Sequence, residues 1–271
     1  MKHFSLCSGI GGLDLAAEWA GFETIAQCEI DEYASKVLAK NFKGVPNLHD
    51  IRTVTNERLA EFGIDGKEIT VISAGFPCQP YSLAGKGRGD RDSRDLWGEV
   101  ARVLGEIKPH WFVGENTPGL FARQNQRFFR RVLDDLTALG YSVGWGIWGA
   151  CDVGAPHKRN RVFIIANSYG KRGLCVYENS EKGCSEMCLS STSPRTSWEN
   201  IRSYKEIGRV FRILRYTPEP DRKIARDDNG LSEGVDRLRC LGNAVVPAQA
   251  YPIFKAIADF YGGQNGKGKR D

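Results

Sequence analysis

The sequence predicts an α/β fold with a doubly wound, mainly parallel sheet. Across residues 1–166, short β-branched or aromatic runs alternate with segments of helical periodicity, and turns separate them. This alternation is typical of parallel sheets that carry helices on both faces. The clearest run, Ile69–Ala74, is rich in Ile, Thr and Val, and Gly75 and Pro77 then end it. From residue 167 to about 236 the periodicity is lost, and Ser, Asn, Gly and charged residues dominate.

Each predicted element has its own signature. Strands are expected where β-branched and aromatic residues cluster, at 2–6, 23–29, 69–74, 110–115, 142–150 and 161–166. Helices are expected where apolar residues recur every three or four positions, at Leu13, Ala16, Ala17 and Ala20 and at 33–41, 96–107, 128–139 and 248–261. Residues 263–271 have the composition of a disordered basic tail.

Composition narrows the class of protein. The 271-residue chain is 41% hydrophobic, which is enough for a sizeable core. No apolar run reaches membrane-spanning length and no charged-then-apolar leader is present, so we expect neither a membrane segment nor a secretory signal. Eight irregularly spaced cysteines do not suggest a disulfide framework, and a reducing, cytoplasmic setting is expected. The spacing of Cys175, Cys184 and Cys188 matches no zinc module, so no metal is expected.

The charge is distributed unevenly. Residues 1–150 carry 17 Lys and Arg against 19 Asp and Glu, a net charge of −2. Residues 151–271 carry 21 against 14, a net charge of +7. The second half therefore has the charge of a segment that binds a polyanion such as nucleic acid, although a solvated basic surface has the same composition.

A glycine-rich turn, Ser8-Gly9-Ile10-Gly11-Gly12, lies between the first strand and the first helix. Glycine there allows a tight turn and a close approach to a ligand, and the helix N-terminus favours a negatively charged group. Glu29 ends the second strand about 20 residues later, where an acid binds ribose hydroxyls in nucleotide sites. An incidental surface glutamate is the alternative interpretation of the same spacing.

Two further strand ends carry reactive side chains. Cys78 follows the 69–74 strand, in a loop made rigid by prolines and polar by Gln79 and Ser82. A nucleophilic cysteine is favoured there over a buried structural one, because a cationic glycine-rich loop follows and reactive thiols occupy such settings. Glu115 ends the 110–115 strand at the same sheet edge, either as an acid of raised pKa or as a turn residue.

A basic segment precedes the last predicted strand of the sheet. Pro156-His157-Lys158-Arg159-Asn160-Arg161 places three cations within four residues. In an extended segment alternate residues face the same way, so Arg159 and Arg161 are expected to point together. Two convergent guanidinium groups suit a phosphate or a polar base edge.

These motifs, in this order, resemble the cytosine-C5 DNA methyltransferase family, and in particular its compact phage or prophage members. Residues 4–15 resemble its first cofactor motif, 75–82 its Pro-Cys loop, 92–97 an element that follows that loop, 114–117 its Glu-Asn motif, 150–161 its arginine motif and 241–247 its final motif. The chain departs from the family pattern near Ser5, where an acid is usual, and at Cys7, Thr117 and His157. The segment between the last two motifs is short, at roughly 70 residues.

The resemblance implies an S-adenosyl-L-methionine-dependent methyltransferase sheet with a small irregular target-recognition domain. The cofactor-binding and catalytic domain would comprise residues 1–166 and 237–262. The target-recognition segment would comprise residues 167–236. The implied partner is double-stranded DNA, whose cytosine is flipped out of the duplex. A cognate restriction endonuclease, a monomeric state and no membrane association are also expected.

The resemblance also assigns roles to individual residues. Cys78 would attack C6 of the cytosine, Glu115 would hold its N3 edge, and Arg159 and Arg161 would bind O2 and a phosphate. Cofactor contacts are expected from Ser8, Gly9, Gly11, Gly12, Glu29, Ile30, Asp50, Ile51, Pro77, Leu96, Asn243 and Val245. Nucleic-acid contacts are expected from Gln79, Ser82, Arg195, Arg202, Arg209, Arg212 and Arg215.

Three other functions are compatible with parts of this pattern. Methylation of cytosine in RNA would use the same residues. A non-catalytic DNA-binding module on the same fold is disfavoured because Cys78 and Glu115 are both present. A cysteine-dependent enzyme that acts on a small nucleotide would not need the positive second half.

Overall fold

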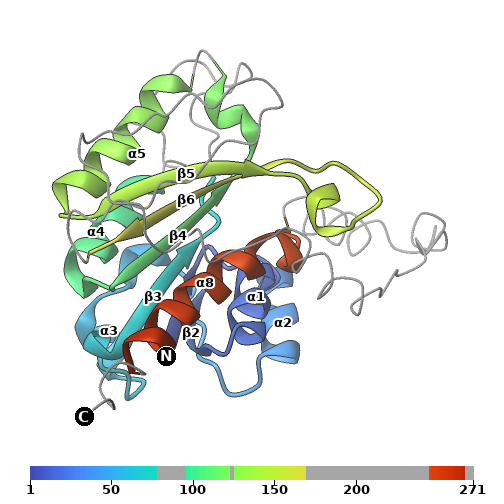
Figure 1. Cartoon of the computed structure of the whole chain (residues 1–271). Helices are drawn as coiled ribbons and strands as arrows, with labels where there is room; N and C mark the ends of the chain where they lie inside the picture. Colours follow the sequence, from blue (N-terminus) through green and yellow to red (C-terminus); the bar gives the residue numbers. More distant parts are fainter. Residues whose placement is uncertain (78–95, 123–124, 169–243, 266–271) are drawn as a thin grey trace, which may run out of the picture.

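The computed structural model describes residues 1–77, 96–122, 125–168 and 244–265, with the side chains of 262–265 left out. Within these residues the core is a six-stranded sheet in the order β2-β1-β3-β4-β6-β5 (Figure 1). The strands are β1 Lys2–Leu6, β2 Glu23–Cys28, β3 Ile69–Ala74, β4 Trp111–Asn116, β5 Ser142–Trp148 and β6 Arg161–Asn167. All six predicted strands are confirmed, with ends that differ by one or two residues.

The sheet is mainly parallel, as predicted. β2, β1, β3 and β4 pair in parallel, and β6 runs antiparallel between β4 and β5. β5 and β6 therefore form a hairpin whose connection spans residues 149–160. β6 also extends through Asn167, one residue into the segment that the sequence assigned to recognition.

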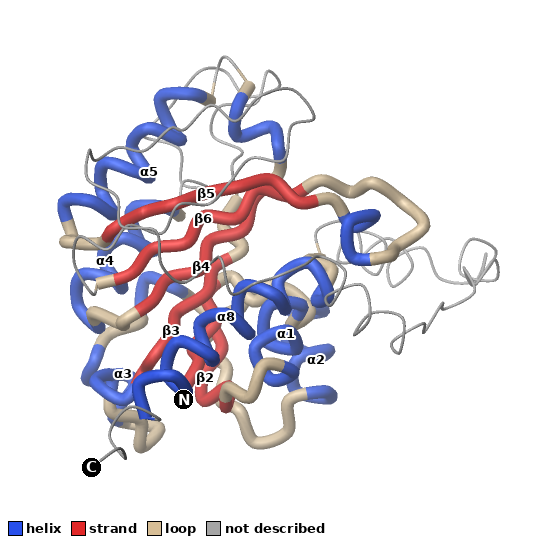
Figure 2. The backbone as a smooth tube through the Cα atoms, in the orientation of Figure 1, coloured by secondary structure: helices blue, strands red, loops and turns tan. Residues whose placement is uncertain are grey.

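Helices cover both faces, which confirms the doubly wound arrangement (Figure 2). On one face α1, Gly12–Trp19, packs against α8, Pro247–Asn265. The other face carries α3, Asn56–Ala60, α4, Trp97–Ile107, and α5, Gln126–Ala138. α2, Glu32–Asn41, follows β2. The short α3 and the 3₁₀ turns η1 Ile51–Thr53, η2 Gly66–Glu68, η5 Pro118–Phe121 and η6 Ala150–Val153 were not predicted.

Alternation along β1 shows how the two faces are built. Phe4 and Leu6 enter the core under α4 and α5, whereas His3 and Ser5 face α1 and α8. His3 is fully buried and bonds Ser73 Oγ at 2.8 Å and Thr24 Oγ1 at 3.1 Å. Burial lowers the pKa of this histidine to about 3, so it is a neutral core residue.

The strand register aligns the carboxyl ends of four neighbouring strands. Leu6 pairs with Cys28 and with Ala74, and Ala74 pairs with Gly114. The residues that follow these positions form a row along one edge: Cys7, Glu29, Gly75 and Glu115. Open α/β sheets bind their ligands at this edge. Among the described helices, none has the length and apolar character needed to span a membrane.

Candidate active site

The glycine-rich turn sits at the carboxyl edge, after β1, and its geometry requires glycine. Gly9 and Gly11 have φ values of +57° and +88°, in the left-handed region that side chains disfavour. A Cβ at Gly11 would lie 2.3 Å from the Phe42 ring. A Cβ at Gly12 would lie 2.4 Å from the carbonyl oxygen of Val245, which precedes α8. The predicted cofactor residues Gly12 and Val245 are thus in direct backbone proximity.

Glu29 directly follows β2, and its side chain contacts the same turn. Its Oε2 accepts a hydrogen bond from the backbone N–H of Gly9 at 2.7 Å, and Oε1 accepts from Asp31 N–H at 2.8 Å. The carboxylate therefore lies at the turn, as the 20-residue spacing predicted. Ser8 is less available to a ligand, because its hydroxyl donates to Ser5 O and accepts from Cys28 N–H.

A buried polar network lies next to the glycine-rich turn and was not predicted from the sequence. Asp14, in the first turn of α1, accepts from Ser5 Oγ at 3.0 Å and from Gln27 Nε2 at 2.9 Å. Burial raises the pKa of Asp14 to about 6, although these two hydrogen bonds oppose the shift. Ser5, near which the resembled family usually has an acid, here donates to an acid of α1, Asp14.

The other predicted cofactor residues occupy different settings. Ile30 is 64% exposed, unusual for a large apolar side chain, and follows Glu29 directly. Asp50 caps η1 and pairs with Arg52 at 2.8 Å, while the Ile51 side chain is buried in the core. Leu96 is half-buried immediately before α4.

Glu115 is the penultimate residue of β4, in a buried position where the charges of two arginines act on it. Arg161 Nε lies 2.8 Å from Glu115 Oε1, an ion pair in which both side chains are mostly buried. The N–H does not point at this oxygen, so Oε1 has no hydrogen-bond donor within the described part of the chain. Burial raises the pKa of Glu115 to about 7, while the charges of Arg161 and Arg159 act to lower it. Burial thus moves the pKa of this carboxyl toward neutral pH despite the two arginines.

Arg159 and Arg161 both act on Glu115, but the predicted reason for their convergence was wrong. Arg159 is not extended: its φ is +34°, in the left-handed region. Its guanidinium donates to the carbonyl of Ala244, and burial lowers its pKa. Arg161 is the first residue of β6, on the face that Phe163 shares. The two side chains are brought to Glu115 by a turn of the backbone, which residue alternation does not predict.

Asn116 ties this cluster to the predicted catalytic loop. Its side chain donates to the carbonyl of Phe76 at 2.9 Å and accepts from Thr117 N–H at 2.8 Å. Phe76 and Pro77 are the last described residues before the predicted catalytic loop, so Asn116 holds the backbone two residues before Cys78 in the sequence. The site residues that lie outside the described residues are Cys78, Gln79, Ser82, Arg195, Arg202, Arg209, Arg212, Arg215 and Asn243. Sequence analysis assigned no role to Asn116, although it lies within the Glu-Asn motif.

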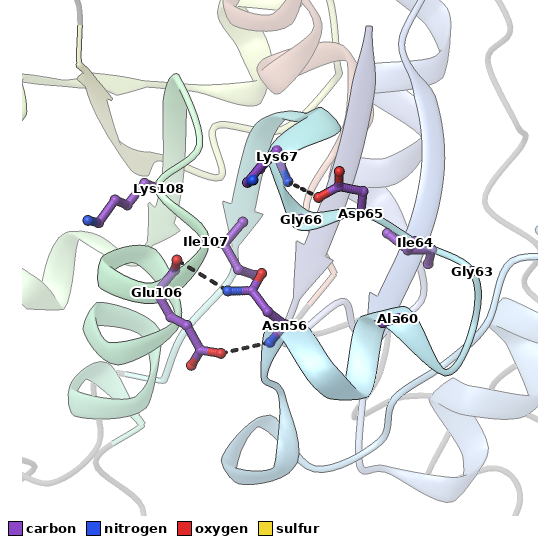
Figure 3. A pocket seen from close by; sticks show the side chains of 10 residues that line it. All are labelled: Asn56, Ala60, Gly63, Ile64, Asp65, Gly66, Lys67, Glu106, Ile107 and Lys108. Carbon is purple, nitrogen blue, oxygen red and sulfur yellow. Dashed lines mark hydrogen bonds between the residues drawn. The ribbon is translucent and has the colours of Figure 1, made fainter.

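A separate hollow of about 760 Å³ lies at the opposite edge of the sheet, between α3, η2 and the end of α4 (Figure 3). Its carboxylates are engaged locally: Glu106 Oε1 accepts from Asn56 N–H at 2.7 Å, and Asp65 accepts from Lys67 N–H at 3.0 Å. These bonds cap short helical turns. The hollow is remote from the strand ends that carry Glu29 and Glu115.

Among known proteins, two curated methyltransferases are similar to this chain. The chain is 38% identical over 171 residues to the type II methyltransferase M.NgoBI of Neisseria gonorrhoeae, covering 62% of this chain and 50% of that protein. It is 37% identical to the type II methyltransferase M.FnuDI of Fusobacterium nucleatum, covering 61% and 46%. The chain thus spans about half the length of these curated relatives.

A solved structure shares the fold. A protein encoded within an E. coli prophage superimposes with a TM-score of 0.54 at 29% identity, covering 62% of this chain and 46% of that chain. The sequence model of one family, described as C-5 cytosine-specific DNA methylase, matches residues 1–231. Because this match covers most of the 271 residues, the chain belongs to the C-5 cytosine-specific DNA methylase family.

Proposed function

We propose that this protein is a DNA (cytosine-5-)-methyltransferase that takes its methyl group from S-adenosyl-L-methionine and acts on a flipped-out cytosine. The observation that carries the proposal is the Glu115–Arg161–Arg159 cluster at the carboxyl edge of the sheet, next to the root of the Cys78 loop. The glycine-rich turn and Glu29 lie along the same edge, so a cofactor and a base held there would meet.

The residues present fit such a cofactor. A Cβ at Gly9 would meet nothing within 4 Å, so the backbone there is open to a ligand, whereas Phe42 and Val245 fill the space beside Gly11 and Gly12. Each oxygen of Glu29 accepts one backbone N–H and keeps capacity for a ribose hydroxyl. Exposed Ile30 provides an apolar surface for an adenine ring. When bound, S-adenosyl-L-methionine supplies an electrophilic methyl group carried on a sulfonium.

Glu115 activates the target ring in this proposal. In its protonated form the carboxyl donates to N3 of cytosine, and Oε1, to which no described residue donates a hydrogen bond, accepts from the exocyclic amine. Protonation at N3 withdraws electrons from C6, so the Cys78 thiolate adds there and C5 becomes nucleophilic. After methylation, loss of the C5 proton and expulsion of Cys78 restore the aromatic ring.

Arg161 and Arg159 have two tasks in the same step. They bind the cytosine O2 and a neighbouring phosphate, which places the flipped base over the carboxyl edge. They also limit how far burial raises the pKa of Glu115, which keeps its proton transferable near neutral pH.

Target recognition is proposed for residues 167–236, with double-stranded DNA as the substrate and a cognate restriction endonuclease as a functional partner. The net charge of +7 on residues 151–271 supports binding to DNA phosphates. The relatives named above are type II methyltransferases, which supports the same substrate class. A monomeric state and a cytoplasmic setting complete the proposal.

The test is mass spectrometry of nucleosides from cells that express the protein. We expect 5-methylcytosine to accumulate in plasmid DNA and not to accumulate with the Cys78→Ser variant. Methylation confined to RNA would replace DNA with RNA as the substrate. Unmodified DNA and RNA, together with cofactor-independent DNA binding, would indicate a non-catalytic module.

A further inference from the structure

Gln249 lies in the first turn of α8 and is almost completely buried, although no role was predicted for it. Its side-chain nitrogen donates to the carbonyl oxygen of Trp148 at 2.9 Å and to that of Arg159 at 3.0 Å. A carboxamide NH₂ group has two hydrogens, so both are used. The reversed amide would place its oxygen against two carbonyl oxygens, which excludes that orientation.

The two carbonyls stand at the two ends of the 149–160 connection. Trp148 is the last residue of β5 and pairs with Arg161, the first residue of β6. One step inside the connection, Ala150 N–H donates to Lys158 O at 2.6 Å. Gln249 lies 90 residues after Arg159 in the chain and therefore links the two ends of this connection through its two hydrogen bonds.

Arg159 depends on such support because its backbone is in the left-handed region, which costs energy for a residue with a Cβ. Its carbonyl is fixed by Gln249 and its guanidinium donates to Ala244 O. Both ends of the arginine are thus held by the one segment 244–249. The same segment lies against the glycine-rich turn, where Val245 O approaches Gly12.

We propose that Gln249 is a positioning residue: it fixes the left-handed turn at Arg159 and, through the closed connection, aims Arg159 and Arg161 at Glu115. The catalytic consequence rests on the proposed function, but the geometry concerns the free protein. Arg161 and Arg159 are the charged groups that act on Glu115 among the described residues. If Gln249 is lost, the backbone turn at Arg159 is no longer fixed, and the ion pair of Arg161 with Glu115 and the field of Arg159 at that carboxylate both weaken.

The experiment uses Gln249→Met, which keeps the length of the side chain and removes both donors. The carboxyl of Glu115 is titrated by NMR in the free, full-length protein with ¹³C-labelled glutamate, and Glu115→Gln identifies its signal. We expect the Glu115 pKa to rise by more than about half a unit above the wild-type value, because a nearby opposite charge lowers a carboxyl pKa by roughly 1–3 units. In methylation assays kcat should fall at least tenfold with little change in the KM for S-adenosyl-L-methionine.

Tyr141→Phe is the matched control. It also removes one buried donor from a backbone carbonyl, that of Pro109 at 2.8 Å, but at the opposite end of the sheet. This variant should leave the Glu115 titration and kcat as in wild type.

An unchanged Glu115 pKa in Gln249→Met overturns the inference. If Gln249→Met does not fold, the same titration on Gln249→Asn decides, since the shorter amide does not reach both carbonyls: an upward shift supports the inference and no shift overturns it. A wild-type protein that methylates nothing contradicts the proposed function. If Gln249→Met still raises the Glu115 pKa relative to that wild type, the positioning role stands.

Discussion

At the scale of single residues, the proposed chemistry depends on a carboxyl that exchanges its proton near neutral pH. Burial makes the protonated form of Glu115 more stable, and the two arginines make the ionised form more stable. The balance leaves a pKa of about 7, a value suited to general acid catalysis at cellular pH. An exposed glutamate would be almost fully ionised there.

Glu115→Gln tests this balance. Glutamine keeps the shape but has no proton to give, so kcat should fall by about 10²–10⁴, the usual contribution of a positioned acid. The wild-type pH–rate profile should contain an ionisation near pH 7, with the protonated, active form of Glu115 present below it. The variant's profile should lack that ionisation. A profile that keeps it would assign the group to another residue.

At the scale of elements, the glycine-rich turn at the start of α1 lies against the segment that precedes α8. Gly12→Ala places a methyl group against the carbonyl of Val245, and backbone cannot yield as a side chain can. We expect the Kd for S-adenosyl-L-methionine, measured by calorimetry, to rise more than tenfold. Gly98→Ala is the control: its Cβ meets only the end of the Arg131 side chain, so better helix propensity should raise the free energy of unfolding by up to about 0.5–1 kcal/mol and leave the cofactor Kd unchanged. Equal cofactor affinity in Gly12→Ala would contradict the close approach.

The same helix carries a stability term that depends on pH. The folded pKa of Asp14, about 6, lies above its unfolded value, so the native state binds the proton more tightly. Stability from this group is therefore highest below the unfolded pKa near 4 and is lost as pH rises through 6, by about 3 kcal/mol in total for a shift of roughly two units.

Asp14→Asn removes this titration. In urea unfolding, the free energy of the variant relative to wild type should be at least about 1 kcal/mol more favourable at pH 7.5 than at pH 4.5. The same relative stability at both pH values would mean that Asp14 ionises normally in the folded protein.

The elements themselves were largely predictable, because local composition determines them. Runs such as Ile69–Ala74 have β-branched residues on both faces, as a strand buried on both sides requires. The antiparallel insertion of β6 between β4 and β5 was not predictable, since pairing partners distant in sequence leave no local pattern. Nor was the left-handed backbone of Arg159, because an arginine gives no signal of positive φ. Its stabilising contact with Gln249 spans 90 residues.

At the scale of the whole molecule, the chain divides into a nearly neutral first half and a basic second half. Residues 1–150 have a net charge of −2 and residues 151–271 one of +7. Binding to DNA should therefore depend strongly on salt, because each neutralised phosphate releases a counterion. The glycine-rich turn, Glu29 and Glu115 could be located from sequence because strand ends meet at one edge; the recognition contacts could not, because 167–236 has no periodicity.

Alanine replacements at Arg195, Arg202, Arg209, Arg212 and Arg215 should separate into two groups. A base-reading arginine should relax one position of the methylated site, at a cost of about 1–3 kcal/mol in discrimination. A phosphate-binding one should lower activity evenly and reduce the salt slope by about one. Bisulfite sequencing and salt titrations distinguish them. If none of the five replacements changes the site preference or the salt slope, recognition lies elsewhere, and residues 85–94 are the next segment to test.

The covalent step at Cys78 is the central claim, and trapping on DNA that contains 5-fluorocytosine tests it most directly. Fluorine at C5 cannot leave as a proton does, so the Cys78–C6 bond formed before methyl transfer should persist. With S-adenosyl-L-methionine present, wild-type protein should form a denaturant-resistant adduct whose cross-linked peptide contains Cys78, and Cys78→Ser should form none. An active wild-type enzyme that leaves no adduct, or an adduct through another residue, would contradict the account.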